Sequence, residues 1–370
     1  MWLQTKDKNI DQFFLIFVLF FLVFGLIILN SSSSALAYNK FGDVYYFVKR
    51  QLFSGILPGL IFFWIFSKID YVHWLKWNKY FYFLVACLLV MVFIPGIGTT
   101  NNTVAHSWIN FPFSFQPSEL AKLVVALVLA SMFSQQGRNI RDFQNGLLPI
   151  FFTLIPIFVL ILVQPDIGTL SILCFMVFFV LILAGVEWKV IALLSLVGII
   201  AFGFLMFDGH RRDRMSVFLH PEIDPQGIGY HVNAAYLAVG SGGIWGVGYG
   251  HSRQKHLYLP EVQADSVFAV FAEEFGFVIS VGFVFLFFIF TLKGFQIANQ
   301  APDKFGYLLV SGIMVWFFIQ ASLNMLAMVG GAPITGLPLP LISHGGTAMV
   351  VNLAALGIVA NVSRKRNYKN

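Results

Sequence analysis

Residues 240–276 read GSGGIWGVGYGHSRQKHLYLPEVQADSVFAVFAEEFG, and from Val267 they begin an apolar stretch that continues to about residue 292. They close a polar segment, residues 208–265, in a chain that is otherwise mostly apolar. An apolar stretch of about 20 residues is long enough to cross a bilayer as a helix. This part of the sequence therefore predicts a membrane helix that follows a long polar loop.

The rest of the chain repeats the apolar pattern. It is 58% hydrophobic and 11% charged and holds 43 phenylalanines, which is outside the usual range of soluble domains. Ten candidate spans lie at about 13–30, 45–66, 80–95, 119–134, 147–163, 168–185, 190–207, 267–292, 306–329 and 345–362. Spans that satisfy their own backbone hydrogen bonds in hydrocarbon indicate a helical bundle rather than a barrel. We expect an all-α polytopic membrane protein: one integral membrane domain, residues 1–370, with ten helices and a long outward loop, about 208–265, between helices 7 and 8.

Charge placement predicts the orientation of this bundle. With a cytoplasmic N-terminus, most of the 23 lysines and arginines fall in inside segments, whereas the outside segments 96–118 and 330–344 contain none. This is the positive-inside bias. We therefore expect both termini in the cytoplasm and the long loop on the outer face. The pI near 9.2 then reflects topology and not a nucleic-acid partner.

The N-terminal region has two readings. A basic start, an apolar run and Ala35-Leu36-Ala37 resemble a cleavable signal peptide. The run is longer than the usual core of about 7–15 residues, which favours a retained helix. Ser31–Ser34 is predicted as a flexible turn at the outer end of that helix.

Five ionisable residues fall within or at the ends of apolar spans, where charge is costly and usually faces the bundle interior or a wet cavity. They are Glu119, Lys122, Asp166, Glu273 and Glu274. Glu119 and Lys122 are three residues apart and share one helix face. Glu273 lies deep in its span, and Lys122 is its predicted partner. A functional cavity and a buried ion pair that only fixes helix packing remain open alternatives.

Asp166 and Asp265 each stand where a loop enters a span. Asp166 is predicted to cap the following helix, since Asp accepts from first-turn amides; a lipid or metal contact is the alternative. Asp265 is also at a plausible N-cap position, where the positive helix end would keep it ionised. Such a carboxylate could instead act as a general base or bind a divalent ion.

The long loop is basic. Its guanidinium groups match phosphate oxygens, although a solvated charge run at a membrane boundary has the same composition. The candidate binding residues are Arg211, Arg212, Arg214, Arg253, Lys255 and Glu261. The histidine spacings match no metal box, so no zinc site is expected. The loop is therefore predicted to bind a charged lipid at the bilayer surface.

Several segments stand in a recognisable order. They are Trp108-Ile109, Gln116-Pro117-Ser118-Glu119-Leu120-Ala121-Lys122, Gln164-Pro165-Asp166-Ile167-Gly168-Thr169, Arg211-Arg212-Asp213-Arg214, Gly240-Ser241-Gly242-Gly243, Ser252-Arg253-Gln254-Lys255, Leu259-Pro260-Glu261, Phe268-Ala269-Val270, Glu273-Glu274, and Gly336-Leu337-Pro338-Leu339-Pro340 with Ser343 and Gly345-Gly346. Together they resemble the SEDS family (shape, elongation, division and sporulation), which includes FtsW, RodA and SpoVE, and they are most similar to the FtsW branch.

This resemblance implies a ten-helix peptidoglycan glycosyltransferase of the bacterial plasma (inner) membrane. Such an enzyme polymerises lipid II into glycan strands and releases undecaprenyl pyrophosphate, in cell division or cell-shape maintenance. The family's essential acid falls on Asp265, which would activate the attacking hydroxyl directly or through Mg²⁺ or Mn²⁺; no organic cofactor is expected. The implied partners are a class B penicillin-binding protein and other divisome or elongasome proteins. The residues expected to line or brace the central cavity are Trp108, Glu119, Lys122, Asp166, Glu273 and Ser343.

This chain departs from the family pattern beside the expected acid. Relatives commonly read His-Thr-Asp-Phe where it has Gln263-Ala264-Asp265-Ser266, and Ser-Tyr-Gly-Gly where it has Ser343-His344-Gly345-Gly346. They commonly carry Gln where it has Ala234. These departures keep open a non-catalytic scaffold that activates a penicillin-binding protein. A lipid II flippase, in which the intramembrane charges form a translocation path, is the other alternative.

Overall fold

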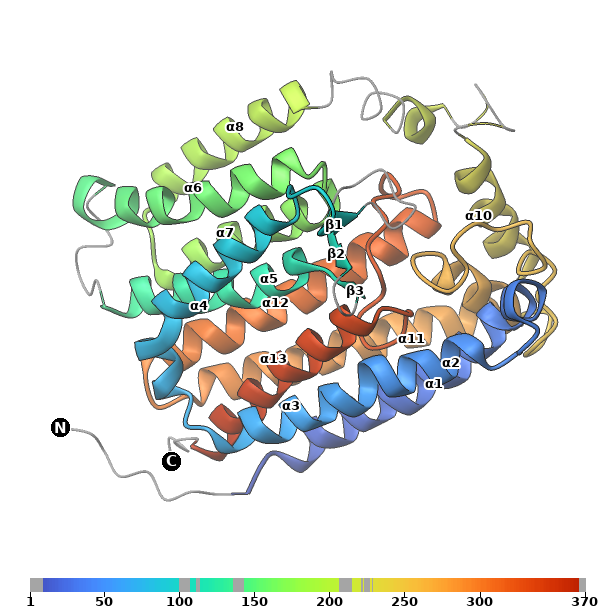
Figure 1. Cartoon of the computed structure of the whole chain (residues 1–370), viewed down its shortest axis with the longest axis horizontal. Helices are drawn as coiled ribbons and strands as arrows, with labels where there is room; N and C mark the ends of the chain where they lie inside the picture. The colour runs from blue at the N-terminus through green and yellow to red at the C-terminus, as the bar shows by residue number, and fades with distance from the viewer. Residues whose placement is uncertain are drawn as a thin grey trace.

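The computed structural model describes residues 9–99, 107–110, 114–135, 143–205, 215–220, 222, 227 and 229–365. Its helices lie side by side with their axes roughly along one direction (Figure 1). The start of α1 (Gln12–Phe41) and the end of α13 (Gly346–Arg364) lie at one end of the bundle, which we call the terminal end. The opposite end carries α10 (Tyr230–Ser241) and the segment 242–266, and we call it the loop end.

Each of the ten predicted spans coincides for most of its length with helix. Besides α1, α10 and α13, the helices are α2 (Tyr46–Gln51), α3 (Leu57–Lys68), α4 (Val72–Met91), α5 (Pro117–Gln135), α6 (Leu148–Val163), α7 (Ile167–Ala184), α8 (Trp188–Leu205), α11 (Val267–Asn299) and α12 (Lys304–Met328). A π-helical turn (Leu52–Ile56) joins α2 to α3, and another (Phe143–Leu147) precedes α6. Within the described ranges, seven spans are long and apolar enough to cross a membrane, and α6 and α8 contribute shorter apolar helices. The tenth, α4, has a polar first half. The predicted all-α polytopic architecture is confirmed.

The centre of the bundle is formed by α5, α12 and α13, whose residues are mostly buried. Helix α12 packs against α5, α7 and α11, and α13 packs against α3. The α3–α13 contact needs a small residue, because a Cβ added at Gly357 would lie 2.6 Å from the Phe63 carbonyl oxygen. Close approach over small residues is a usual way for helices to pack in lipid.

Phenylalanines fill the contact between α1 and α11. The rings of Phe21 and Phe287 lie 5.2 Å apart between centroids, and those of Phe14 and Phe290 lie 5.8 Å apart. Such edge and offset ring contacts add to the energy of burial. Part of the chain's high phenylalanine content therefore serves helix packing.

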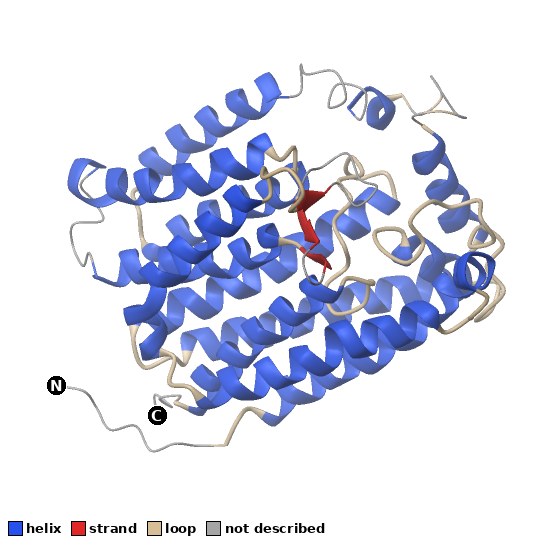
Figure 2. Cartoon of the chain, viewed as in Figure 1, coloured by secondary structure: helices blue, strands red, loops and turns tan. Residues whose placement is uncertain are grey.

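Three short strands lie in the loops toward the loop end (Figure 2, red). They are β1 (Gly98–Thr99), β2 (Trp108–Asn110) and β3 (Ser114–Phe115), and they form an antiparallel sheet in the order β1-β2-β3. Helix α10 lies within the segment that was predicted as loop. The loop end is therefore more structured than its sequence predicted.

Helix α1 continues without interruption to Phe41. The flexible turn predicted at Ser31–Ser34 is wrong, because Ser32 and Ser33 are buried and both donate their hydroxyls to the Leu29 carbonyl. Back-bonding of this kind satisfies serine within a helix.

Helix α11 is interrupted at Gly276, whose φ of 75° and ψ of −178° are not helical. This backbone region is almost restricted to glycine. The amides of Phe277 and Val278 donate to the carbonyls of Gly243 and Ile244, at 2.9 and 3.3 Å. The segment 242–248 therefore replaces hydrogen bonds that a continuous helix would make within itself.

The exchange is reciprocal. Val247 and Gly248 donate their amides to the carbonyls of Glu273 and Glu274, at 3.0 and 2.9 Å. A Cβ at Gly276 would lie 2.2 Å from the Gly246 nitrogen, so glycine is also required for this approach. The first nine residues of α11, 267–275, thus form a short helix held from the side by segment 242–248.

Candidate functional site

Asp265 lies at the loop end, immediately before α11, and is 5% exposed. Its Oδ1 accepts a long hydrogen bond, 3.4 Å, from the Ser266 hydroxyl, and its carbonyl accepts from Asn324 Nδ2 at 2.8 Å. The prediction of Asp265 as N-cap is wrong: the N-cap is Ser266, and no side chain caps the first turn. The carboxylate is therefore not committed to the helix end.

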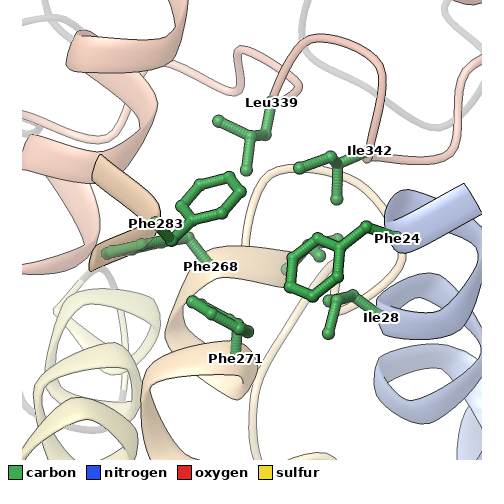
Figure 3. Close-up of a pocket in the computed structure, with 8 residues that line it drawn as sticks. Phe24, Ile28, Phe268, Phe271, Phe283, Leu339 and Ile342 are labelled. Carbon is green, nitrogen blue, oxygen red and sulfur yellow. The ribbon is translucent and has the colours of Figure 1, made fainter. Parts of the chain in front are cut away.

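A small apolar pocket of about 10 Å³ lies beside the first turn of α11, between α1, α11 and the loop before α13 (Figure 3). Its walls are Phe24, Ile28, Val267, Phe268, Phe271, Phe283, Leu339 and Ile342. No charged group lines it. It has space for at most about one water molecule, so its side chains form a closely packed apolar wall beside α11.

A second pocket, open and about 230 Å³ in volume, has a mixed lining. It is lined by Leu36, Lys40, Lys255, Leu257, Leu259, Pro260, Glu261, Val262 and Gln263. Residues just before Asp265 thus line the mixed pocket, and residues just after it line the apolar one. Only the mixed pocket has room for a ligand group, and such a group would lie close to the Asp265 backbone.

Glu119 and Lys122 form a buried ion pair on α5, with 2.8 Å between Lys122 Nζ and Glu119 Oε1. Lys122 also donates to Gln320 Oε1 at 2.8 Å and lies 5.0 Å from the centroid of the Trp316 ring. The predicted pairing of Lys122 with Glu273 is therefore wrong. Glu119 Oε2 is buried with no hydrogen-bond partner in the described part of the chain, so this cluster keeps one free acceptor.

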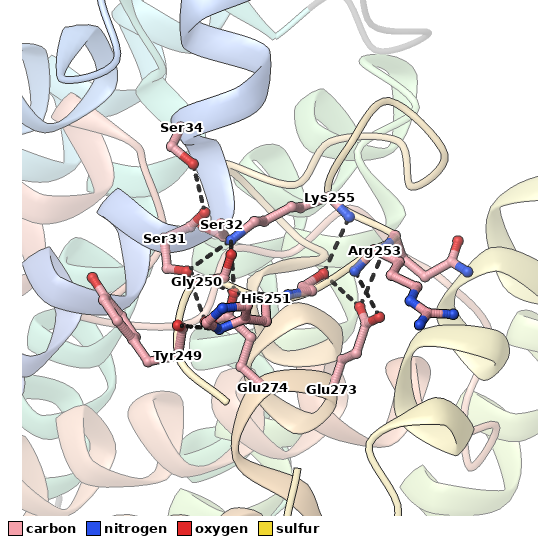
Figure 4. Close-up of polar contacts among 12 residues, drawn as sticks. Ser31, Ser32, Ser34, Tyr249, Gly250, His251, Arg253, Lys255, Glu273 and Glu274 are labelled. Carbon is pink, nitrogen blue, oxygen red and sulfur yellow. Dashed lines mark hydrogen bonds and ion pairs between the residues drawn. The ribbon is translucent and has the colours of Figure 1, made fainter. Parts of the chain in front are cut away.

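Glu273 and Glu274 bind the loop 250–255 instead (Figure 4). Glu273 accepts the Ser252 hydroxyl and the amides of Arg253 and Gln254. Glu274 pairs with Lys255 at 2.8 Å, and both are almost fully buried. The two acids thus hold the loop against α11.

Lys255 has further internal partners. Its Nζ donates to the Gly250 carbonyl at 2.7 Å and to Ser31 Oγ at 3.2 Å, and Ser31 in turn donates to Glu274. The charge predicted to bind substrate is therefore already paired within the protein. The Arg253 side chain is exposed, as is Glu261. Arg211, Arg212 and Arg214 lie outside the described residues.

Asp166 caps α7, as predicted: its Oδ1 accepts the Thr169 amide at 3.0 Å. Its Oδ2 accepts the hydroxyls of Thr169 and Ser118, both at 2.9 Å, and Gln116 Nε2 at 3.4 Å. These donors leave little acceptor capacity for a metal or lipid. Asp166 therefore braces α5 against α7.

Two other predicted cavity residues lie in the loops. Trp108 is half-buried in β2, and Ser343 is buried and accepts the Leu339 amide at 2.9 Å. The next residue, His344, donates its amide to the Gln263 carbonyl at 2.8 Å. Burial, and to a lesser extent the Arg50 charge, lowers the pKa of the His344 imidazole to about 4. Two positions that depart from the family pattern are thus hydrogen-bonded neighbours.

Several buried amide side chains belong to the site although the predictions from the sequence did not include them. Gln320 bridges Lys122 and the Pro338 carbonyl, and Asn324, one turn further along α12, contacts Asp265. Gln51 accepts the Gly345 amide and donates to the Ser343 carbonyl. The signal was present, since Gln320 and Asn324 lie four residues apart in an apolar span and so share one face.

The arrangement defines a class: a polytopic helical membrane protein with a buried acid between an apolar and a mixed pocket. Residues 11–368 match the family model for the FtsW, RodA and SpoVE cell cycle proteins. The chain therefore belongs to the SEDS family.

Individual relatives extend over nearly the whole chain. Stage V sporulation protein E of Bacillus subtilis is 37% identical over 99% of this chain and 100% of its own. A probable peptidoglycan glycosyltransferase FtsW of Trichlorobacter lovleyi is 36% identical, covering 95% of this chain and 93% of its own.

Solved structures agree with the fold. A chain from a peptidoglycan synthase complex, studied for the coordination of polymerization and crosslinking, superposes with a TM-score of 0.77 at 28% identity, and both chains are fully covered. The rod shape determining protein RodA of Thermus thermophilus superposes with a TM-score of 0.71 at 28% identity, over 100% of this chain and 99% of its own.

Proposed function

We propose that this protein is a peptidoglycan glycosyltransferase that polymerises lipid II, with Asp265 as the general base. The observation that carries the proposal is the position of Asp265: a buried carboxylate at the start of α11, flanked by an apolar and a mixed pocket. Relatives named as probable peptidoglycan glycosyltransferases match almost the whole chain, which supports this activity.

In the proposed reaction, a sugar hydroxyl of one lipid-linked disaccharide attacks the anomeric carbon of another. The new glycosidic bond forms as the bond to the pyrophosphate oxygen breaks, and undecaprenyl pyrophosphate leaves with that electron pair. The hydroxyl proton passes to the Asp265 carboxylate. General base catalysis of this kind typically contributes about 10²–10⁴-fold.

The mixed pocket, about 230 Å³ in volume, suits a sugar or phosphate group of the substrate. The first isoprene units of the undecaprenyl tail are assigned to the apolar wall that includes Phe24, Phe268 and Phe271. Because Lys255 is paired with Glu274, we assign the leaving pyrophosphate to Arg253 and to Arg211, Arg212 and Arg214 rather than to Lys255.

A divalent cation fits this site only if the protein and the substrate both coordinate it. The described residues contain no cluster of three His, Cys, Asp or Glu side chains that could hold one. Mg²⁺ commonly takes one carboxylate together with substrate phosphates, and Asp265 is the carboxylate that we assign to this role. Mg²⁺ or Mn²⁺ held there would supply positive charge to the leaving pyrophosphate.

The proposed location is the plasma membrane of a bacterium, with both termini in the cytoplasm and the loop end outside. The proposed partner is a class B penicillin-binding protein, whose transpeptidase would crosslink the new strand. The match to a chain of a peptidoglycan synthase complex supports an assembly of this kind.

The terminal end gives reason to favour an enzyme over a flippase. There Lys293 pairs with Asp11, Lys365 pairs with Asp70, and Tyr71 donates to Asp303. These contacts join α1, α4, α11, α12 and α13 where a translocation path would have to open toward the cytoplasm.

The test is glycan synthesis by the purified protein, supplied with lipid II and Mg²⁺ or Mn²⁺, with and without a class B penicillin-binding protein. The parent is expected to form long strands, and Asp265→Asn is expected to lose at least about 100-fold in rate. Equal synthesis by both proteins would refute the role of Asp265. Strand formation by neither, with headgroup flipping in liposomes, would favour the flippase, and stimulation of the partner's transpeptidase alone would favour the scaffold.

A further inference from the structure

Asn324, on α12, lies beneath the backbone that carries Asp265. It is 2% exposed. Its Nδ2 donates to the Asp265 carbonyl at 2.8 Å and to the Leu337 carbonyl at 2.7 Å. Since both partners are acceptors, only the amide NH₂ can face them. The side-chain oxygen is buried with no hydrogen-bond partner within the described ranges, so the two donated bonds set the orientation of the amide.

The two carbonyls belong to the two backbone segments that border the Asp265 carboxylate. One is the segment 257–265, and the other begins at Gly336, where an added Cβ would lie 4.0 Å from Asp265 Oδ2. One side chain from the bundle core therefore sets the spacing between the acid and the loop that faces it.

The Asp265 segment has little regular structure of its own to fix it. Leu257 and Glu261 have positive φ angles, 69° and 50°, and the stretch between them consists of turns. The first turn of α11 has no side-chain cap. A second tie to the rest of the protein is the bond from the His344 amide to the Gln263 carbonyl.

We propose that Asn324 is a positioning residue for Asp265: it sets the distance of the carboxylate from the reacting hydroxyl without itself touching substrate. This inference rests on the proposed function. Loss of the donor removes one hydrogen bond from each of two buried carbonyls, which favours a shift of the backbone that carries them. A displacement of about 1 Å can cost about 100-fold in rate.

The competing account is that a buried asparagine merely stabilises the bundle. Asn361 on α13 is a matched control, because it is also 2% exposed and makes the same kind of contact. Its Nδ2 donates to the Ser67 carbonyl at 2.9 Å, and its Oδ1 accepts the Tyr71 amide at 2.9 Å. It lies at the terminal end, far from Asp265.

The experiment compares Asn324→Leu with Asn361→Leu in the lipid II assay, measuring kcat, KM and thermal stability. Asn324→Leu is expected to lower kcat about 10- to 100-fold with KM within about twofold of the parent. Asn361→Leu is expected to lower thermal stability while kcat stays within about twofold. If Asn324→Leu does not fold, Asn324→Gln, which keeps the donor but moves it by one methylene, is expected to lower kcat about 10-fold.

A parent-like kcat in the Asn324 variant that folds, or equal losses of kcat at both positions, would overturn the positioning role. The Asp265→Asn variant in the same assay separates the two proposals. If it is fully active, the proposed function fails. If it is inactive while the Asn324 variant turns over normally, only the positioning inference fails.

Discussion

The buried pair of Lys255 and Glu274 allows a quantitative test of how the loop end is held together. Both side chains are at most 3% exposed, and their charged atoms are 2.8 Å apart. In Lys255→Met the Glu274 carboxylate stays buried and keeps only Ser31 and a long contact to the Ser252 amide, 3.4 Å. Removing one partner of a buried pair costs about 3–5 kcal/mol.

We expect the lower figure, because the loop lies at the surface and its release can hydrate Glu274. About 3 kcal/mol corresponds to roughly a 100-fold larger opening constant. Hydrogen exchange of peptides from 242–256 measures this directly, since Val247 and Gly248 donate their amides to α11 there. The double variant Lys255→Met/Glu274→Gln removes both charges and should recover most of the protection, so the two changes should not be additive.

Lys293→Met is the matched control. It makes the same chemical change in the Lys293–Asp11 pair, 2.9 Å, at the terminal end, and it should leave exchange in 242–256 unchanged. Exchange in Lys255→Met within about threefold of the parent would refute the reasoning, because it would mean a coupling of less than about 1 kcal/mol.

Two further predictions concern the loop end. His344 has a folded pKa of about 4, below its ordinary value of 6.5, so the unfolded chain binds the proton first as the pH falls. Stability should therefore be full above about pH 6.5 and fall by up to about 3 kcal/mol as the pH drops toward 4, and His344→Gln should remove this slope in unfolding curves measured across that range. Gly276→Ala should lower the thermal midpoint markedly, because its Cβ would lie 2.2 Å from the Gly246 nitrogen at a φ of 75°. Gly282→Ala on the same helix, where an added Cβ meets nothing within 4 Å, should be neutral or stabilising, and equal effects of the two changes would contradict the role of the kink.

The spans and the cap at Asp166 were predictable because their causes are local. A run of apolar residues must form helix in lipid whatever it packs against, and a capping aspartate binds amides two or three residues ahead. The prediction of a turn at Ser31–Ser34 was wrong because it considered only the local preference of serine. In the structure these residues are helical, and Ser31 donates its hydroxyl to Glu274, which is 243 positions away in the chain.

The pairing of the buried charges was predictable only in part. Glu119 and Lys122 meet because they are three residues apart on one helix. Glu273 does not meet Lys122, because the break at Gly276 brings segment 242–248 against α11 and places the amides of Arg253 and Gln254 at its carboxylate. No periodicity in the sequence reports which loop will dock at such a break.

Hydropathy and charge placement alone determined that this chain is a polytopic helical bundle, and its motifs identified Asp265 as the acid to examine. Only the tertiary structure decided the surroundings of that acid. Asn324 donates to its carbonyl, Ser266 is the N-cap residue of α11, and one apolar and one mixed pocket lie beside the neighbouring residues. The reason is physical. Burial in lipid is a property of each residue, whereas a hydrogen-bond partner depends on how helices are rotated and where they break.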